Sequence, residues 1–305
     1  MTLISKVADI VQIARELHKQ PVRVACASPE DSDSLEALRM AADEGIAAPI
    51  AVGRRQAIVT LANTLGISLD GFEFVDVVEP EDSAPRAARL VAEGEAACLM
   101  KGSLPTKAVI RAVLDQRSGL RSGKILSHCS LFDCPQLNKP VIITDPAVNI
   151  KPSFSQKIEI VKNAAEVMRK LGVKRPKVAM LAAVERVELP AMPATLDAKL
   201  MERMAEAGLL GEVVVQGPLA LDDAVSPDVV RAKDLTGPVV GDADILVVPE
   251  IETGNVFYKA LTCFGGLDPA GMIWGAKVPI IVPSRADTAR TKFLGMAFAA
   301  AMSEP

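Results

Sequence analysis

The stretch VRVACASPEDSDSLEALRMAAD, at residues 22–43, decides the fold. It begins with an apolar run at residues 22–27 and ends with a segment of helical periodicity at residues 34–43. Between the two lie short polar side chains, Asp31 among them, of the type that caps the first turn of a helix. A strand that leads directly into a helix is the repeating unit of an α/β fold.

Further units of the same kind follow along the 305-residue chain. Apolar runs that predict strands occupy residues 22–27, 49–52, 72–77, 97–100, 125–132, 141–144, 178–183, 213–216, 245–249 and 278–283. Segments with a period of about 3.6 residues lie between most of them, at residues 34–43, 84–93, 155–171, 196–207 and 288–302. Strands that alternate with helices predict βαβ units and a mainly parallel sheet.

One region interrupts this alternation. The strand-like runs at residues 125–132 and 141–144 are separated only by residues 133–139, which carry no helical pattern. A chain of this length favours two domains over one core. We therefore predict a first α/β domain of residues 1–122 plus 285–305, with the last helix returning to it, and a second α/β domain of residues 123–284.

Composition narrows the class of protein. The net charge is −4 and aromatic residues make up 3% of the chain, so the basic patches and stacking platforms of nucleic-acid binders are not expected. No stretch approaches about 20 uncharged apolar residues and no signal-peptide pattern is found, which predicts a cytoplasmic protein without membrane contact. Five cysteines without a CxxC pair, with two histidines, predict neither disulfides nor a metal site.

The sequence MKGSLPTK at residues 100–107 follows a predicted strand and opens a predicted helix. Free N–H groups and the dipole at a helix N-terminus attract anions, and neighbouring basic side chains strengthen that attraction. The alternative is an ordinary strand-to-helix turn with solvated lysines. The pattern favours an anion site, and its candidate residues are Lys101, Gly102, Ser103, Lys107 and Arg111.

Two more loops place polar side chains after predicted strands. The first is DPAVN at residues 145–149, and the second is PEIETGN at residues 249–255, followed by Tyr258 and Lys259. Ligands of α/β proteins bind outside the carboxyl ends of parallel strands, whereas the alternative for each loop is a capping turn. The candidate binding residues in these loops are Asp145, Asn149, Asn255 and Lys259.

The sharpest signal is IIVPSRAD at residues 280–287, where a fully apolar strand ends in Ser284 and Arg285 before a helix begins. Ser284 can donate a hydrogen bond, and the planar fork of Arg285 matches the oxygens of a phosphate group. The alternative is a capping serine beside a surface arginine. Because three other predicted strand ends also carry polar groups, the pattern favours a phosphate-binding site at Ser284 and Arg285.

Together these segments resemble the phosphate acetyl/butyryl transferase family, and within it they are most similar to the phosphate butyryltransferases. The likeness rests on MKGSLPT, DPAVN, GDAD at residues 241–244, PEIETGN with Tyr258 and Lys259, and the Ser284–Arg285 pair, in this order. The resemblance implies two α/β domains of the isocitrate/isopropylmalate dehydrogenase architecture with an active-site cleft between them. It also implies a homodimer with no bound metal, nicotinamide or other cofactor, and coenzyme A as a substrate.

The resemblance also implies roles for individual residues. Ser284 and Arg285 match the pair that binds the acyl phosphate, and Arg111 matches a second arginine. The acetyl enzymes carry an aspartate, their proposed general base, seven residues after the serine, where this chain has Thr291. Asp287, three residues after the serine, is placed as in butyryl-type relatives. This departure favours acyl chains longer than acetyl.

The predicted function is reversible transfer of a short acyl group, butyryl or acetyl, between coenzyme A and inorganic phosphate through an acyl phosphate. The coenzyme A thiolate attacks the acyl carbonyl directly, and Asp287 or Asp145 accepts the proton. Three alternatives stay open: an acyltransferase that uses acyl carrier protein, an oxidative decarboxylase, and a catalytically silent module that binds coenzyme A or acyl phosphate. Ser284 and Arg285 favour catalysis, whereas Thr291 favours the silent module.

Overall fold

The computed structural model describes residues 4–304 and divides into two compact units. The terminal unit comprises Ala8–Lys124 and Ala270–Pro305, and the central unit comprises Ile125–Pro269 with Met1–Val7. The sequence predicted divisions at 122/123 and 284/285, so the second division lies earlier in the chain than predicted. The reason is that the strands after residue 269 hydrogen-bond inside the terminal unit. Residues 1–3 and 305 of the predicted domains lie outside the described residues.

The terminal unit is built on a mostly parallel sheet with the strand order β3-β2-β1-β4-β11-β10. Only β10 and β11 pair antiparallel among these strands. The chain runs outward from β1 to β3 and then returns to place β4 on the other side of β1, so the sheet has a switch point there. The strands are β1 (Val22–Ala27), β2 (Ala47–Gly53), β3 (Glu73–Asp76), β4 (Cys98–Lys101), β10 (Ala270–Trp274) and β11 (Ile280–Ile281).

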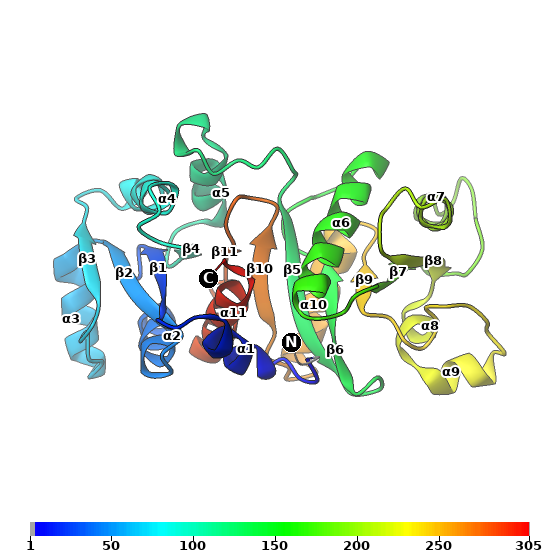
Figure 1. Cartoon of the computed structure of the whole chain (residues 1–305), viewed down its shortest axis with the longest axis horizontal. Coiled ribbons are helices and arrows are strands. Elements are labelled where there is room, and N and C mark those ends of the chain that lie inside the picture. Colours follow the sequence, from blue (N-terminus) through cyan, green and yellow to red (C-terminus); the bar gives the residue numbers. More distant parts are fainter. Residues whose placement is uncertain (1–3, 305) are drawn as a thin grey trace. The chain divides into compact units, whose positions relative to one another are not determined.

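Helices cover both faces of this sheet, which explains why its central strands are buried on both sides. In Figure 1, α4 and α5 lie on one side of the strands, and α1, α2, α3 and α11 lie on the other. The helices of the unit are α1 (Asp9–Leu17), α2 (Ser32–Asp43), α3 (Arg55–Leu65), α4 (Ser83–Ala92), α5 (Thr106–Leu114) and α11 (Ala289–Met302), with 3₁₀ turns η1 (Pro80–Asp82) and η2 (Gln116–Ser118).

The last helix, α11, is the centre of the core beneath the sheet. Every residue from Thr291 to Met302 is buried, and the helix packs against α1, α2 and β10. A helix that is apolar on all sides is stable only when other elements surround it. Its start is capped by Thr288, whose hydroxyl accepts a hydrogen bond from the N–H of Thr291 at 3.2 Å. The prediction that this helix belongs with the first half of the chain agrees with its place in the terminal unit.

The central unit begins with an antiparallel hairpin of β5 (Ser127–Cys134) and β6 (Lys139–Thr144). The strands β9 (Ile245–Val247), β7 (Lys177–Leu181) and β8 (Val214–Leu219) then extend it in parallel, in the order β5-β6-β9-β7-β8. The helices of the unit are α6 (Phe154–Lys170), α7 (Ala194–Glu206), α8 (Leu221–Val225), α9 (Pro227–Ala232) and α10 (Ile251–Cys263).

The helix α6 begins with a capping box formed by Ser153 and Gln156. The N–H of Gln156 donates to the Ser153 hydroxyl at 3.3 Å, and the Gln156 side chain accepts from the N–H of Ser153 at 2.9 Å. This reciprocal capping box satisfies donors that the first helical turn leaves without partners.

The five predicted strands between residues 125 and 249 correspond to β5, β6, β7, β8 and β9, so the α/β fold class is confirmed.

One part of the terminal sheet differs from the prediction. The sequence predicted a strand at residues 278–283, whereas β11 has only Ile280 and Ile281. The strand β10, with the sequence AGMIW, was not predicted at all. Its alanine and glycine give little strand propensity, and its pairing with β11 supplies the stability that propensity does not.

Replacing Phe298 with alanine tests whether α11 is a core element. Phe298 is 0% exposed, so we expect Phe298→Ala to lower the free energy of unfolding by about 3–5 kcal/mol. The matched control is Phe264→Ala, because Phe264 is 94% exposed and its truncation should change stability by less than about 0.5 kcal/mol. Urea denaturation followed by circular dichroism measures both, and equal losses would contradict a core role for α11.

Candidate active site

Three neighbouring parallel strands of the terminal unit end at one edge of the sheet. Met100 of β4 is aligned with Cys26 of β1 on one side and with Ile281 of β11 on the other. The loops after these strands, residues 28–31, 102–105 and 282–288, therefore leave the sheet together. They do so at the switch point between β1 and β4, where α/β proteins bind ligands. The predicted anion loop and the Ser284–Arg285 loop thus lie at the same edge of the sheet.

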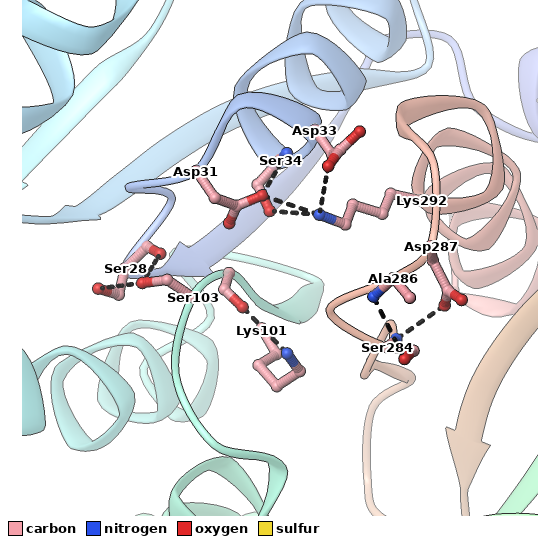
Figure 2. Close-up of polar contacts among 11 residues, drawn as sticks. Ser28, Asp31, Asp33, Ser34, Lys101, Ser103, Ser284, Ala286, Asp287 and Lys292 are labelled. Carbon is pink, nitrogen blue, oxygen red and sulfur yellow. Dashed lines mark hydrogen bonds and ion pairs between the residues drawn. The ribbon is translucent and has the colours of Figure 1, made fainter.

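The loops after β1 and β4 are joined by their backbones. The N–H of Gly102 donates to the carbonyl of Ala27 at 2.8 Å, and the N–H of Ser103 donates to the carbonyl of Ser28 at 2.8 Å. The Ser103 hydroxyl also donates to the Ser28 carbonyl at 3.1 Å (Figure 2). A Cβ on Gly102 would lie 2.1 Å from the Ser28 carbonyl oxygen. Gly102, a candidate residue of the predicted anion site, therefore allows a close approach to the neighbouring loop.

Lys101 is a buried lysine at the end of β4. It is 3% exposed, and its ammonium donates one hydrogen bond among the described residues, to the carbonyl of Gly102 at 3.0 Å. An ammonium has three donors, so this side chain is under-satisfied. Burial lowers the pKa of Lys101, and the charges of Lys292 and Arg285 lower it further, while Asp31 and Cys26 act in the opposite direction.

A second buried lysine lies beside the first. Lys292 of α11 is 4% exposed, and its ammonium donates to a carboxylate oxygen of Asp31 at 2.8 Å and to the Ser34 hydroxyl at 3.4 Å. Asp33 lies 4.0 Å from the same ammonium. Figure 2 shows these three side chains of the loop after β1 and of α2 turned toward Lys292. Two elements far apart in the sequence are thus joined by an ion pair between a buried lysine and a partly buried aspartate.

Asp31 has two roles in this cluster. One carboxylate oxygen, Oδ1, accepts from both Lys292 and the N–H of Ser34, so Asp31 caps α2 as the sequence predicted. The other oxygen, Oδ2, is buried and accepts no hydrogen bond from the described residues. Burial raises the pKa of Asp31, but the hydrogen bonds from Lys292 and Ser34 outweigh it and leave the pKa lowered.

The loop after β11 is held by Asp287. The N–H of Ser284 donates to the Asp287 carboxylate at 2.7 Å, and the N–H of Asp287 donates to the Ser284 carbonyl at 3.2 Å. The Ser284 hydroxyl accepts from the N–H of Ala286 at 3.4 Å (Figure 2). Arg285, at the tip of the loop, is exposed. The loop therefore presents the predicted phosphate-binding arginine to solvent while Asp287 fixes the backbone beneath it.

Lys107 and Arg111 lie on α5, which begins directly after the loop at the end of β4. Both are exposed, because the buried face of this helix carries Val109, Ala112 and Val113. Among residues 4–304, no described hydrogen bond links either side chain to residues 282–288. The structure thus places both cations on the helix that the anion loop opens, with their side chains directed to solvent.

Asp145 and Asn149 belong to the central unit, where they hold a loop together. The Asp145 carboxylate accepts from the N–H groups of Ala147, Val148 and Asn149 at 3.0, 3.0 and 3.1 Å. It also accepts from the Asn149 amide at 2.6 Å, and that amide donates to the Leu126 carbonyl at 2.8 Å. These four hydrogen bonds hold the Asp145 carboxylate within its own loop.

Asn255 and Lys259 lie on α10 of the central unit. The Asn255 amide donates to the carbonyl of Pro146 at 3.5 Å, and the Lys259 ammonium lies 5.1 Å from the centre of the Tyr258 ring. Gly254 lets the first turn of α10 rest on the loop of Asp145, since a Cβ there would lie 2.8 Å from the Pro146 Cα. The segments DPAVN and PEIETGN therefore form one local structure.

No thiol or imidazole of the described residues is placed as a nucleophile at the strand-end loops. Cys26 lies in β1 beneath the loops and is 0% exposed, and burial raises the pKa of its thiol well above the ordinary range. All five cysteines are free, and His128 is buried against Ser130. Among residues 4–304, no three potential metal ligands come together, and no helix is long and apolar enough to cross a membrane.

Sequence reasoning missed Lys292 and its ion pair with Asp31. Asp31 was predicted as a helix cap, and Lys292 was only one residue of a predicted helix. The available signal was the position of Lys292, which is the single charged residue in the otherwise apolar or small-residue stretch from residue 291 to residue 302. A lysine in a helix that is buried on all sides requires a partner.

Known proteins share both the sequence and the fold of this chain. A family model described as "Phosphate acetyl/butaryl transferase" matches residues 77–300. The phosphate butyryltransferase of Clostridium acetobutylicum is 40% identical over 282 residues, which cover 92% of this chain and 93% of that protein. The crystal structure of a branched-chain phosphotransacylase from Enterococcus faecalis V583 matches with a TM-score of 0.81 and 36% identity, covering 92% of this chain and 98% of that one.

A more distant likeness concerns the fold alone. The crystal structure of a 4-hydroxythreonine-4-phosphate dehydrogenase from Burkholderia phymatum matches with a TM-score of 0.53 and 15% identity, covering 94% of this chain and all of the other, 100%. This match confirms the dehydrogenase-like α/β architecture that the sequence predicted.

Replacing Gly102 with alanine tests the backbone contact between the two loops. Because the added methyl group would meet backbone atoms of Ser28, we expect Gly102→Ala to lower the free energy of unfolding by about 3 kcal/mol, the upper range for overpacking. Ser103→Ala is the matched control, since it removes only hydroxyl contacts, worth about 1 kcal/mol. Urea denaturation measures both, and a Gly102→Ala protein as stable as the control would disprove the contact.

Proposed function

Because this chain belongs to the phosphate acetyl/butyryl transferase family, we propose that it transfers a short acyl group reversibly between coenzyme A and inorganic phosphate. The observation that carries this proposal is the meeting of the Ser284–Arg285 loop and the loop after Lys101 at one switch point. The names of the relatives support an acyltransferase of this kind over both the acyl-carrier-protein enzyme and the silent binding module.

The terminal unit offers a phosphate group several positive partners. Arg285 is exposed at the loop tip, and its guanidinium fork matches two phosphate oxygens. The N-terminus of α5 adds free N–H groups and the positive end of a helix dipole, and Lys107 and Arg111 on that helix add charge. We assign the phosphoryl group to this site, with Arg285 as its main ligand.

The reaction needs few groups beyond those that bind phosphate. The thiolate sulfur of coenzyme A attacks the carbonyl carbon, the C–S bond forms, and the bond from that carbon to the phosphate oxygen breaks. A thiol with a pKa near ~8.5 is a few per cent ionised at pH 7, so full ionisation would gain about thirtyfold, roughly 2 kcal/mol. One well-placed donor to developing negative charge contributes about 3–4 kcal/mol. We therefore expect Arg285 and Ser284 to contribute more than any carboxylate.

Ser284 supplies a donor in this scheme. Its hydroxyl oxygen accepts from the N–H of Ala286, which leaves the hydroxyl hydrogen to point at the carbonyl or phosphate oxygen of the substrate. Asp287 accepts the Ser284 N–H and so shapes the loop. Asp145 holds its own loop with four hydrogen bonds. Neither carboxylate is therefore our choice as the proton acceptor.

The finer points of the proposal follow the family. We assign butyryl and chains of similar length as the preferred acyl group, because Thr291 and Asp287 follow the butyryl-type pattern and a phosphate butyryltransferase is among the relatives. Acyl-CoA, inorganic phosphate and acyl phosphate are the proposed ligands, with no bound cofactor. A homodimer and a cytoplasmic location complete the proposal.

A thiol-release assay tests the function. The purified chain is mixed with acyl-CoA and phosphate, and free thiol is measured for acyl groups from acetyl to hexanoyl. We expect thiol release that requires phosphate and is fastest near butyryl. Arsenate in place of phosphate provides a control for direct transfer to an oxyanion. If no acyl-CoA in this range gives phosphate-dependent release, the chain is not a phosphate acyltransferase.

Arg285→Ala tests the phosphate ligand. We expect kcat/KM for the acyl phosphate to fall about 10²–10³-fold, the range for loss of one donor to developing charge. Arg117→Ala is the matched control, because Arg117 is an exposed arginine of the same unit that pairs with Asp115 at 2.8 Å. Circular dichroism confirms that both variants are folded. Wild-type kcat/KM in Arg285→Ala would remove Arg285 from the site.

A further inference from the structure

Lys101 is the one buried cation at the strand-end loops without a carboxylate partner among the described residues. Its ammonium donates to the Gly102 carbonyl at 3.0 Å, whereas the ammonium of Lys292 is bound by Asp31 at 2.8 Å and by Ser34. Lys101 and Lys292 are almost equally buried, at 3% and 4% exposure. A buried ammonium with two unused donors is costly, unless an anion binds it or it gives up its proton.

Charged groups from every neighbouring element act on this lysine. Lys292 of α11 and Arg285 of the loop after β11 repel its positive charge, whereas Asp31 of the loop after β1 and Cys26 of β1 favour it. Cys26 stays a thiol because burial raises its pKa, and the charge of Asp31 is already shared with Lys292. Burial and the two cations therefore prevail, and they lower the pKa of Lys101 from that of an ordinary lysine.

The position of Lys101 suits a group that acts on the substrate. It directly follows Met100, which is aligned with Ile281 of β11, so Lys101 and the Ser284–Arg285 loop leave adjacent strands at the same edge. In Figure 2, the side chain of Lys101 is drawn between Ser103 and Ser284. The charge of Arg285 also acts on Lys101, so a phosphate group held by Arg285 is proposed here as the neighbour of the Lys101 amine.

We propose that Lys101 carries the proton of the coenzyme A thiol to the departing phosphate, an inference that rests on the proposed function. The neutral amine takes the proton from sulfur as the C–S bond forms. The bond between the carbonyl carbon and the phosphate oxygen breaks, and its electron pair goes to that oxygen. The Lys101 ammonium then gives the proton to the phosphate, which leaves as HPO₄²⁻. The reverse reaction uses the same steps in the opposite order.

We call this transfer of a proton from sulfur to Lys101 and from Lys101 to phosphate the relay. The surroundings of Lys101 support both steps. An ordinary lysine amine is neutral in only about 0.04% of molecules at pH 7, so an effective base requires the lowered pKa that burial and neighbouring cations provide. When negative charge develops on the phosphate, the protonated form becomes favourable again. Lys292 is a positioning residue here, because its own ammonium is bound by Asp31 and Ser34 while its charge acts on Lys101.

Lys101→Arg and Lys101→Met separate proton transfer from charge. Arginine keeps the positive charge but does not lose its proton, whereas methionine keeps neither property. We expect Lys101→Arg to lower kcat about 10²–10⁴-fold with the KM for phosphate within about threefold of wild type. Lys101→Met should lose kcat and also raise the KM for phosphate. If Lys101→Arg keeps kcat within about threefold of wild type, the relay is wrong and Lys101 only binds phosphate.

Chemical rescue and the pH profile keep the proposal testable if Lys101→Arg folds poorly. Methylamine and ethylamine should restore activity to Lys101→Ala, with rates that rise with the concentration of neutral amine, and only a folded variant can be rescued. In Lys292→Met, loss of a neighbouring cation raises the pKa of Lys101, so the acidic limb of kcat/KM should move to higher pH. Absence of rescue by either amine, or an unmoved limb, would overturn the relay.

The wild-type thiol-release assay separates this inference from the proposed function. Wild-type protein that releases no thiol with any acyl-CoA contradicts the function itself, and the relay fails with it. Active wild-type protein together with an active Lys101→Arg variant contradicts the relay alone. Active wild-type protein, a deficient Lys101→Arg variant and rescue of Lys101→Ala by amines support both.

Discussion

The parallel pairing of β4 with β1 on one side and β11 on the other is the constraint on which the candidate site depends. It aligns three strand ends that the sequence separates widely, and it places the switch point of the sheet between them. The close backbone contact of Gly102 with Ser28 then fixes two of the three loops to each other. Without this pairing, the end of β4 at Lys101 and the loop that carries Ser284 would not lie at the same edge of the sheet.

The second feature of the candidate site is the pair of buried ammonium groups of Lys101 and Lys292. Lys292 of α11 and Asp31 of the loop after β1 form an ion pair, and loss of Asp31 would leave the buried Lys292 ammonium without its carboxylate partner. The neighbouring ammonium of Lys101 has no such partner among the described residues, so its charge is stabilised less. Lys101 and Lys292 are thus similarly buried, but only the ammonium of Lys292 is bound by a carboxylate, that of Asp31.

Much of the fold and part of the site follow from local patterns in the sequence. Alternating apolar runs and helical periods predict the α/β class, and the Ser284–Arg285 pair stands out because an apolar strand ends in two polar residues. The ion pair of Lys292 with Asp31 could not be predicted, since it joins residues far apart in the sequence. For Asp145, the local sequence pattern was visible but left the role of the side chain open. Its position after a strand suggested ligand binding, but only the structure shows four donors on its carboxylate.

The burial of α11 has a consequence for the order in which the protein is made. A ribosome completes residues 125–269 of the central unit before it has made β10, β11 and α11 of the terminal unit. Domains generally fold as units during synthesis, so the central unit can fold while β1 to β4 still lack their neighbouring strand and core helix. The strands β1 to β4 therefore complete their folding only after the later β10, β11 and α11 have been made.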